Sequence, residues 1–229
     1  MDPKTELPQP PNPEQFTLEE ILKPQHSALI VVDLQNDYLD PNGFFAQKRK
    51  SDISQMQATL PYIQKLVDAA HKAKVPVIFT QGAEDVKLRG KNGLRRAVKW
   101  DEKDGDGSVN SERGTFGWEL NQIKPAEGDI IIEKHKWTSF DGKDQNGKSL
   151  DDILKEKGIE TLVITGVTTE TCVNATIKSA AERDYFVVVP RNSVGSDLPE
   201  QHKEVLKHFD PYDGDLVDEA VILQNWPES

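Results

Sequence analysis

Five short apolar segments recur along this sequence, and segments with helical spacing or turn residues separate them. They are Ala28–Leu34, Val77–Thr80, Asp129–Glu133, Leu162–Ile164 and Phe186–Pro190. Their apolar residues are continuous rather than alternating, which indicates strands that are buried on both faces of a sheet. Strands that alternate with helices predict an α/β fold, here a three-layer α/β/α sandwich with a largely parallel, doubly wound sheet.

The expected helices lie between these strands. Apolar residues at helical spacing predict a helix within residues 52–74, with a break or a start at Pro61. Further helices are expected at Leu150–Lys157, from Cys172 to about Arg183, and at His202–Phe209, with Glu219–Leu223 as a last strand. We predict one domain over residues 27–229, preceded by a Pro-rich N-terminal arm over residues 1–26 with one helical turn at Leu18–Leu22.

Charge and composition exclude several classes of partner. The net charge of −11 argues against nucleic acid and anionic membrane surfaces as the main partners, and no apolar run approaches 18 residues. A single cysteine rules out an internal disulfide framework and suits a reducing compartment. The first 26 residues lack the basic start and apolar core of a signal peptide. We therefore expect a cytoplasmic protein.

Residues 161–181 (TLVITGVTTETCVNATIKSAA) predict a buried strand, a short loop and then a helix that contains Cys172. In an open parallel sheet, ligands bind beyond the carboxyl ends of the strands. The positive end of the helix dipole would lower the pKa of a thiol placed there, and the N–H groups of the first turn would stabilise an oxyanion. The alternative interpretation is that Cys172 is a small buried hydrophobic residue.

Two further polar residues lie at the ends of predicted strands. Asp33 interrupts the apolar segment Ala28–Leu34 near its end, and Lys134 directly follows Asp129–Glu133. A buried carboxylate is costly unless it is paired or functional. Asp33, Lys134 and Cys172 together suit a nucleophile with an acid–base partner and an orienting cation.

Four sequence blocks resemble the isochorismatase-like cysteine hydrolase superfamily, in its amidohydrolase branch. They read ALIVVDLQNDYLDPNG, GTFGWEL, IIEKHKWTSF and ITGVTTETCVNATIKSAAERDY, and they follow one another in the order of the family. The resemblance implies a catalytic triad of Asp33, Lys134 and Cys172. It also implies a cis peptide bond before Thr168, with the N–H groups of Thr168 and Cys172 as the oxyanion hole.

The same resemblance implies a hydrolase that cleaves the C–N bond of a small amide, ureide or carbamoyl compound through a thioester acyl-enzyme. Relatives commonly assemble as dimers or tetramers, so we expect a homo-oligomer. Two alternatives stay open. One is an isochorismatase-type vinyl-ether hydrolase, which does not need Cys172, and the other is a catalytically silent relative that binds a ligand.

Substrate contacts are expected from Gln35, Tyr38, Trp137 and Thr169. The alternative for Gln35 is hydrogen bonding to backbone groups at the strand end, and the alternative for the two aromatic residues is core packing. His202 is interpreted as part of a helix, and Arg95, Arg96 and Lys99 as a solvated charged face rather than a carboxylate site.

No metal and no cofactor are expected. Nicotinamidases resemble this family but carry an aspartate and paired histidines that bind a metal, and the scattered His26, His71, His135, His202 and His208 do not supply that spacing. Two segments depart from a minimal member of the family: residues 81–113, which are longer and more charged than such a member needs, and the loop 141–149 near the expected pocket. The wider charged segment 81–118 is interpreted as a lid or substrate loop, or alternatively as a solvated insertion.

Overall fold

The computed structural model describes residues 12–84, 90–93, 95 and 109–228. Its centre is a seven-stranded sheet in the order β3-β2-β1-β4-β5-β7, with β6 paired to β4. Every strand pairing is parallel. The strands are β1 (Ser27–Val32), β2 (Val77–Gly82), β3 (Ile130–Lys134), β4 (Thr161–Val167), β5 (Phe186–Pro190), β6 (Val194–Gly195) and β7 (Asp215–Val217). The predicted fold class is confirmed.

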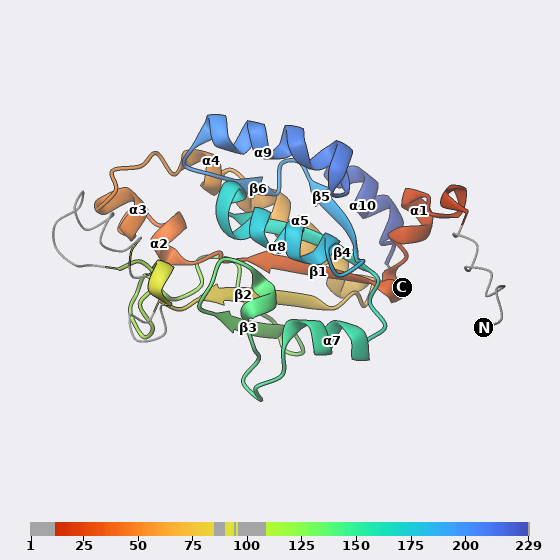
Figure 1. Cartoon of the computed structure of the whole chain (residues 1–229), viewed down its shortest axis with the longest axis horizontal. Coiled ribbons are helices and arrows are strands. Elements are labelled where there is room, and N and C mark those ends of the chain that lie inside the picture. Colours follow the sequence, from red (N-terminus) through yellow and green to blue (C-terminus); the bar gives the residue numbers. More distant parts are fainter. Residues whose placement is uncertain (1–11, 85–89, 94, 96–108, 229) are drawn as a thin grey trace, which may run out of the picture.

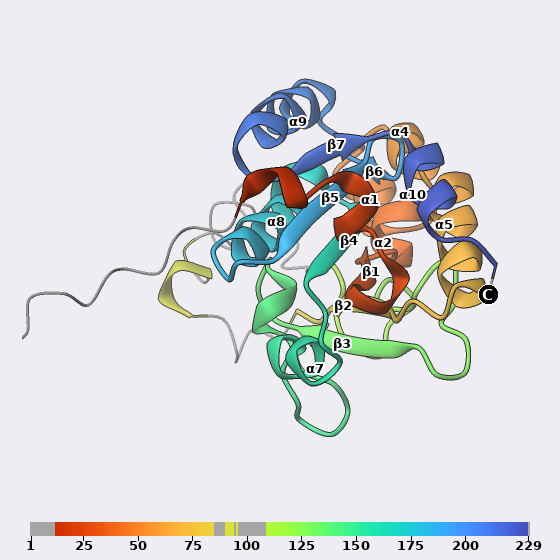
Figure 2. The same cartoon turned by 90° about the vertical axis from the view of Figure 1, so that its right-hand side faces the viewer.

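Helices cover both faces of this sheet. The α-helices are α1 (Leu18–Ile21), α2 (Asn36–Leu39), α3 (Phe44–Gln47), α4 (Ser54–Gln57), α5 (Leu60–Lys72), α7 (Leu150–Glu156), α8 (Asn174–Ala181), α9 (Pro199–Tyr212) and α10 (Glu219–Asn225). Short helical turns are η1 (Pro13–Gln15), η2 (Pro24–His26), η4 (Ser139–Asp141) and the π-helical η5 (Thr169–Val173). Figure 2 shows α5 and α10 on one side of the sheet and α7 and α8 on the other.

The core divides between these two faces because side chains alternate along each strand. Leu29 and Val31 of β1 pack in the cluster that includes α5 and α10. Ile30 and Val32, the neighbouring residues, pack in the cluster that includes α7, α8 and α9. Both faces of the central strand are therefore buried, which explains why its sequence is continuously apolar.

The segment Glu219–Leu223 is a helix and not the strand that its short apolar run predicted. It forms most of α10, in which Glu219 and Ile222 are buried, and Trp226 follows on the same face. This spacing of three and four residues is helical, but a short apolar run alone does not distinguish a strand from a buried helix. The outermost strand is instead β7, which pairs with β5.

The described part of the N-terminal arm packs on the domain. The predicted helical turn is α1, which ends at Ile21. Leu22 is fully buried in the core, and its carbonyl accepts a hydrogen bond from Nε1 of Trp226 at 3.0 Å. Residues 1–11 of the arm lie outside the described residues. The boundary between residues 26 and 27 stays a prediction.

The sheet directs its carboxyl ends to one end of the molecule. Figure 1 shows the arrowheads of β1, β2 and β3 pointing toward the end where α2 and α3 lie. The chain order of the strands reverses between β1 and β4, with β2 and β3 on one side and β5 and β7 on the other. Ligands bind at such a switch point in open α/β sheets. In the described residues, no helix combines the length and apolarity needed to cross a membrane.

Candidate functional site

The switch point brings together the three residues that the sequence predicted. Asp33 directly follows β1, Lys134 is the last residue of β3, and Cys172 lies in η5 after β4. Because the strands are parallel, these positions share one edge of the sheet. All three side chains line one cavity.

Asp33 and Lys134 form a buried ion pair. The Nζ atom of Lys134 lies 2.7 Å from Oδ2 of Asp33, and the two side chains are only 2% and 1% exposed. The other carboxylate oxygen accepts a hydrogen bond from Oγ1 of Thr80 at 2.9 Å. Lys134 also donates to the carbonyls of Lys136 and Trp137, at 3.1 and 2.9 Å. These contacts fix both charged groups in one arrangement.

The pKa of Lys134 reflects the balance between burial and its partners. Burial alone would lower the pKa of the ammonium group, but the charges of Asp33 and Cys172 outweigh it and raise the pKa above its ordinary value. Lys134 is therefore protonated at neutral pH, and it supplies a permanent positive charge to the site.

Cys172 lies in the π-helical turn η5, one element before the α-helix that was expected to hold it. Its thiol lines the cavity with Asp33 and Lys134, and both of those side chains influence its pKa. Burial raises the pKa of this thiol far above its ordinary value, and the nearby Lys134 charge offsets only part of that effect. The expectation of a lowered thiol pKa is therefore wrong: the resting thiol is protonated, and it needs a base.

The turn before the cysteine presents the backbone toward the cavity. The Val167–Thr168 peptide bond is cis, as the resemblance implied. The carbonyl of Thr168 accepts hydrogen bonds from the N–H groups of Thr171 and Val173, at 3.2 Å each. Among the described residues, the Thr168 N–H group donates to no protein acceptor. The resemblance assigns this group to an oxyanion hole with the N–H of Cys172, and that role stays a prediction.

Two of the four expected substrate contacts line the cavity. Tyr38 is 8% exposed and Trp137 is 39% exposed, and both belong to the lining. Burial, followed by the charges of Cys172 and Asp33, raises the pKa of Tyr38, so its hydroxyl stays protonated. Tyr38 therefore offers a neutral hydroxyl beside the triad, and its contact with a substrate stays a prediction.

The other two residues lie behind the lining and satisfy protein groups. The Gln35 amide exchanges two hydrogen bonds with the backbone of Gly82, at 2.8 and 2.9 Å, and donates to the carbonyl of Trp118 at 2.8 Å. Thr169 is fully buried, and its hydroxyl is 2.8 Å from Nδ1 of His202. Neither residue belongs to the described lining, and their contact with a substrate stays a prediction. The hydrogen bond of His202 ties α9 to the turn that carries Cys172.

The cavity also contains residues that sequence reasoning missed. Asn110 donates to the hydroxyl of Tyr38 at 2.8 Å, and the Ser111 N–H group donates to Asp37 at 2.6 Å. These contacts hold part of the long charged segment against the start of the domain. The remaining lining residues that were not predicted are Phe45, Arg49, Gly82, Ala83, Glu84, His135, Lys136 and Thr171. Most lie in loops without periodicity, so no sequence pattern marks them.

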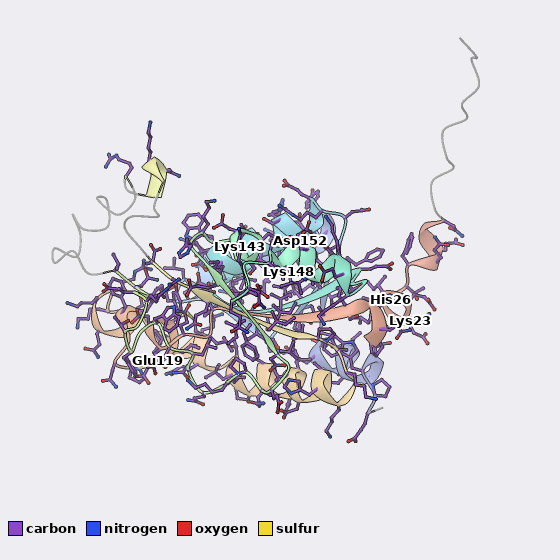
Figure 3. The ribbon with its side chains drawn as sticks, turned by 90° about the horizontal axis from the view of Figure 1, so that it is seen from below. Lys23, His26, Glu119, Lys143, Lys148 and Asp152 are labelled. Atoms are coloured by element: carbon purple, nitrogen blue, oxygen red, sulfur yellow. The ribbon has the colours of Figure 1, made fainter. Side chains whose placement is uncertain are left out.

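The two unusual segments have different relations to the cavity. Of segment 81–118, residues 85–89, 94 and 96–108 lie outside the described residues, including Arg96, Lys99 and Trp100, while its described ends line the cavity. The loop 141–149 instead pairs with the edge of β3 through Glu133 and Lys143. Figure 3 shows Lys143 and Lys148 gathered near Asp152 of α7. The lining contains no residue of this loop within the described residues.

The described lining suits acid–base and nucleophilic chemistry. In residues 12–84, 90–93, 95 and 109–228, no three or more histidine, cysteine, aspartate or glutamate side chains are grouped as metal ligands would be. The cavity has a volume of about 90 Å³, which fits a small compound. What it offers is a thiol in the same lining as an ion-paired carboxylate and ammonium.

Comparison with known proteins agrees with this geometry. Residues 27–220 match the family described as the isochorismatase domain. The chain is 30% identical over 214 residues to the ureidoacrylate amidohydrolase RutB of Pseudomonas syringae pv. syringae (strain B728a), covering 87% of this chain and 80% of the relative.

Solved structures show the same fold. A cysteine hydrolase from Pseudomonas syringae pv. phaseolicola 1448A superposes with a TM-score of 0.72 at 22% identity, covering 89% of this chain and 93% of the other. The N-carbamoylsarcosine amidase of Thermoplasma acidophilum superposes with a TM-score of 0.66 at 23% identity, covering 84% and 96%. The match over residues 27–220 spans most of the chain, and the chain therefore belongs to the isochorismatase family.

Proposed function

We propose that this protein is an amidohydrolase that cleaves the C–N bond of a small amide, ureide or carbamoyl compound, with Cys172 as its nucleophile. The observation that carries the proposal is the buried Asp33–Lys134 pair, which lines one cavity with the Cys172 thiol. The similarity to RutB, a ureidoacrylate amidohydrolase, and the fold shared with an N-carbamoylsarcosine amidase support this class of reaction.

The first half of the reaction forms an acyl-enzyme. Asp33 accepts the thiol proton of Cys172, and Lys134 stabilises the thiolate as it forms. The sulfur attacks the carbonyl carbon, and the N–H groups of Thr168 and Cys172 stabilise the negative oxygen of the tetrahedral intermediate. Asp33 then gives its proton to the leaving nitrogen as the C–N bond breaks. The products are an amine or ammonia and a thioester on Cys172.

The second half releases the acyl group. Asp33, again ionised, accepts a proton from water, and the resulting hydroxide attacks the thioester carbonyl. The C–S bond breaks and Cys172 regains its proton. Because burial keeps the thiol protonated at rest, Asp33 is essential in both halves, and the positive charge of Lys134 stabilises each anion formed.

The vinyl-ether alternative does not use a cysteine nucleophile. The buried Asp33–Lys134 pair, which lines one cavity with the Cys172 thiol, favours the amidohydrolase over the vinyl-ether alternative. A homo-oligomeric state and a cytoplasmic location stay expectations, and light scattering on the purified protein tests the former.

Ammonia release from a panel of amides, ureides and carbamoyl compounds tests the proposal. We expect release by the wild type and none above background by Cys172→Ala or Asp33→Asn. Circular dichroism and the unfolding midpoint establish that each variant is folded. Release by Cys172→Ala at the wild-type rate would reject the cysteine mechanism, and release by neither protein from any compound would move the assignment to the vinyl-ether or ligand-binding alternative.

A further inference from the structure

A buried carboxylate lies directly behind the wall of the cavity. Asp37 is 9% exposed and does not belong to the described lining, but the next residue, Tyr38, does. The Oδ1 atom of Asp37 accepts a hydrogen bond from the N–H group of Phe44 at 2.9 Å. Its Oδ2 atom accepts one from the N–H group of Ser111 at 2.6 Å. Hydrogen bonds to a carboxylate are among the stronger ones in proteins, so Asp37 holds both backbone groups firmly.

The two donors belong to different parts of the wall. Phe44 begins α3, and its neighbour Phe45 lines the cavity. Ser111 lines the cavity itself, and its carbonyl accepts a hydrogen bond at 3.0 Å from the N–H group of Glu84, another lining residue. Asp37 therefore links three stretches of the wall that are remote from one another in sequence.

The backbone at Ser111 depends on such a partner. Its φ angle is +58°, in the left-handed region that residues other than glycine rarely adopt, and the residue is only 1% exposed. A residue persists in that region only where its surroundings hold it there. Because Asp37 accepts the Ser111 N–H group, the course of the wall at this point depends on the carboxylate.

Gly117 leaves the space that the carboxylate occupies. A Cβ atom at residue 117 would lie 2.1 Å from Oδ1 and 2.3 Å from Oδ2 of Asp37. The carbonyl of Gly117 also accepts a hydrogen bond from the Asp37 N–H group at 3.0 Å. The backbone at residue 117 therefore packs directly on the carboxylate, and a methyl group there would displace the carboxylate without removing it.

We propose that Asp37 is a positioning residue that holds the cavity wall at α3 and at Ser111, and thereby sets the size of the substrate that can reach Cys172. It acts through the lining residues that it fixes. This inference rests on the proposed function in taking Cys172 as the reacting group, and it adds what limits access to that group.

Two alkylating reagents of different size measure access to Cys172 without a substrate. Cys172 is the only cysteine in the chain, so its reaction with iodoacetamide or N-benzyliodoacetamide is read from the intact mass. Both reagents carry the same reactive group, and their rates with glutathione correct for intrinsic reactivity. In the wild type, we expect the benzyl reagent to react at least about 10-fold more slowly, because a preformed wall excludes it from a small cavity.

Asp37→Asn keeps the shape of the side chain but places an amide NH₂ group against one of the two N–H donors. We expect the difference between the reagents to shrink by at least about 5-fold, mainly through faster reaction of the benzyl reagent, because the wall loses a strong hydrogen bond. Gly117→Ala should have the same effect, and it decides the matter if Asp37→Asn does not fold. An unchanged difference in the folded variants, or a wild type that reacts equally with both reagents, would overturn the role of Asp37.

Asp129→Asn is the matched control. The Asp129 side chain is 5% exposed, and its Oδ2 atom accepts a hydrogen bond from the Ala126 N–H group at 2.8 Å, just before the first residue of β3. The variant should leave the ratio of the two rates within about 2-fold of the wild type, because sites that share no partners act independently. An equal change of the ratio in Asp129→Asn would show that general destabilisation, and not the wall, controls access.

Turnover separates this inference from the proposed function. For an amide from which the wild type releases ammonia, Asp37→Asn should raise KM by about 10-fold and change kcat less, because the reacting groups stay in place. The expected change in the reagent ratio, with no ammonia release from any amide, would reject the proposed function and retain the role of Asp37. Ammonia release that depends on Cys172, with the reagent ratio unchanged in the folded variants, would retain the function and reject that role.

Discussion

The ammonium nitrogen of Lys134 lies 2.7 Å from a carboxylate oxygen of Asp33, although the strands that carry these residues are separated by β2. Between them lies Gly82, which pairs with Lys134 across the sheet and has no side chain to obstruct the approach. The lysine crosses one strand to reach the carboxylate, and both groups are buried beside the only cysteine. This pair is the electrostatic basis of the proposed chemistry.

Removing the cation should leave Asp33 as a buried, uncompensated charge. We expect Lys134→Met to lower the free energy of unfolding by about 3 to 5 kcal/mol and to abolish turnover. The double variant Asp33→Asn with Lys134→Met, which removes both charges, should recover much of that stability but no activity. Urea denaturation and ammonia release measure both effects. If Lys134→Met were as stable as the wild type, Asp33 and Lys134 would not form a buried ion pair.

Thr80 should position the catalytic base. Its hydroxyl donates to Oδ1 of Asp33, and Thr80→Val removes this donor with little change of shape. We expect a loss of about 1.5 to 3 kcal/mol in stability and a drop of roughly 10-fold or more in kcat. The control is Thr165→Val, which removes a buried hydroxyl that donates to the carbonyl of Ile30 instead. If both variants reduce kcat equally, Thr80 has no special role in the reaction.

Gly166 is required where β4 passes β1. Its φ angle is +112°, and a Cβ atom there would lie 2.1 Å from the carbonyl oxygen of Val32. We expect Gly166→Ala to destabilise the protein by more than about 3 kcal/mol or to prevent folding. Gly147→Ala is the control, because φ is +81° but nothing lies within 4 Å of the added atom, so about 1 kcal/mol is expected. Thermal unfolding of the two variants separates the destabilisation caused by the steric clash at residue 166 from the destabilisation caused by the positive φ angle, which both positions share.

The buried thiol should make stability fall with rising pH. Burial raises the pKa of Cys172 in the folded protein, so above about pH 8.5 the unfolded chain loses this proton while the folded protein keeps it. The unfolded state is then stabilised, and the free energy of unfolding falls by up to about 1.4 kcal/mol per pH unit once the unfolded thiol is fully ionised. Between pH 8.5 and 9.5, the difference in the free energy of unfolding between the wild type and Cys172→Ala should fall by about 1 kcal/mol. A difference independent of pH would show that the thiol pKa is ordinary.

The sequence predicted the fold, and it predicted three candidate site residues that line one cavity in the structure, because both predictions depend on local patterns. Continuously apolar segments identified β1 to β5, and the chemistry at their ends identified Asp33, Lys134 and Cys172. Because the strands are parallel, their carboxyl ends lie at the same end of the sheet. The three residues were therefore expected to lie close together, whatever the conformation of the loops. The error at α10 arose because a run of four apolar residues suits either a strand or a buried helix.

The thiol pKa and the rest of the lining depend on tertiary packing. A helix dipole is readable from sequence, but the burial that outweighs it at Cys172 comes from elements packed around η5. Gln35 and Tyr38 lie three residues apart, yet one satisfies backbone groups and the other faces the cavity. The guanidinium of Arg49 lies over Phe45, which in turn packs on Tyr38. Such contacts between loops have no periodic signature.

The most direct test of the central claim is an intact-mass measurement on the protein quenched in acid during turnover. The account predicts a mass increase equal to the acyl part of the substrate, located on the peptide that contains Cys172 and lost as the substrate is consumed. Cys172→Ala should show neither the adduct nor ammonia release, with a rate at least about 1,000-fold below the wild type. Sustained ammonia release by Cys172→Ala, with no adduct on the wild type, would contradict a cysteine nucleophile.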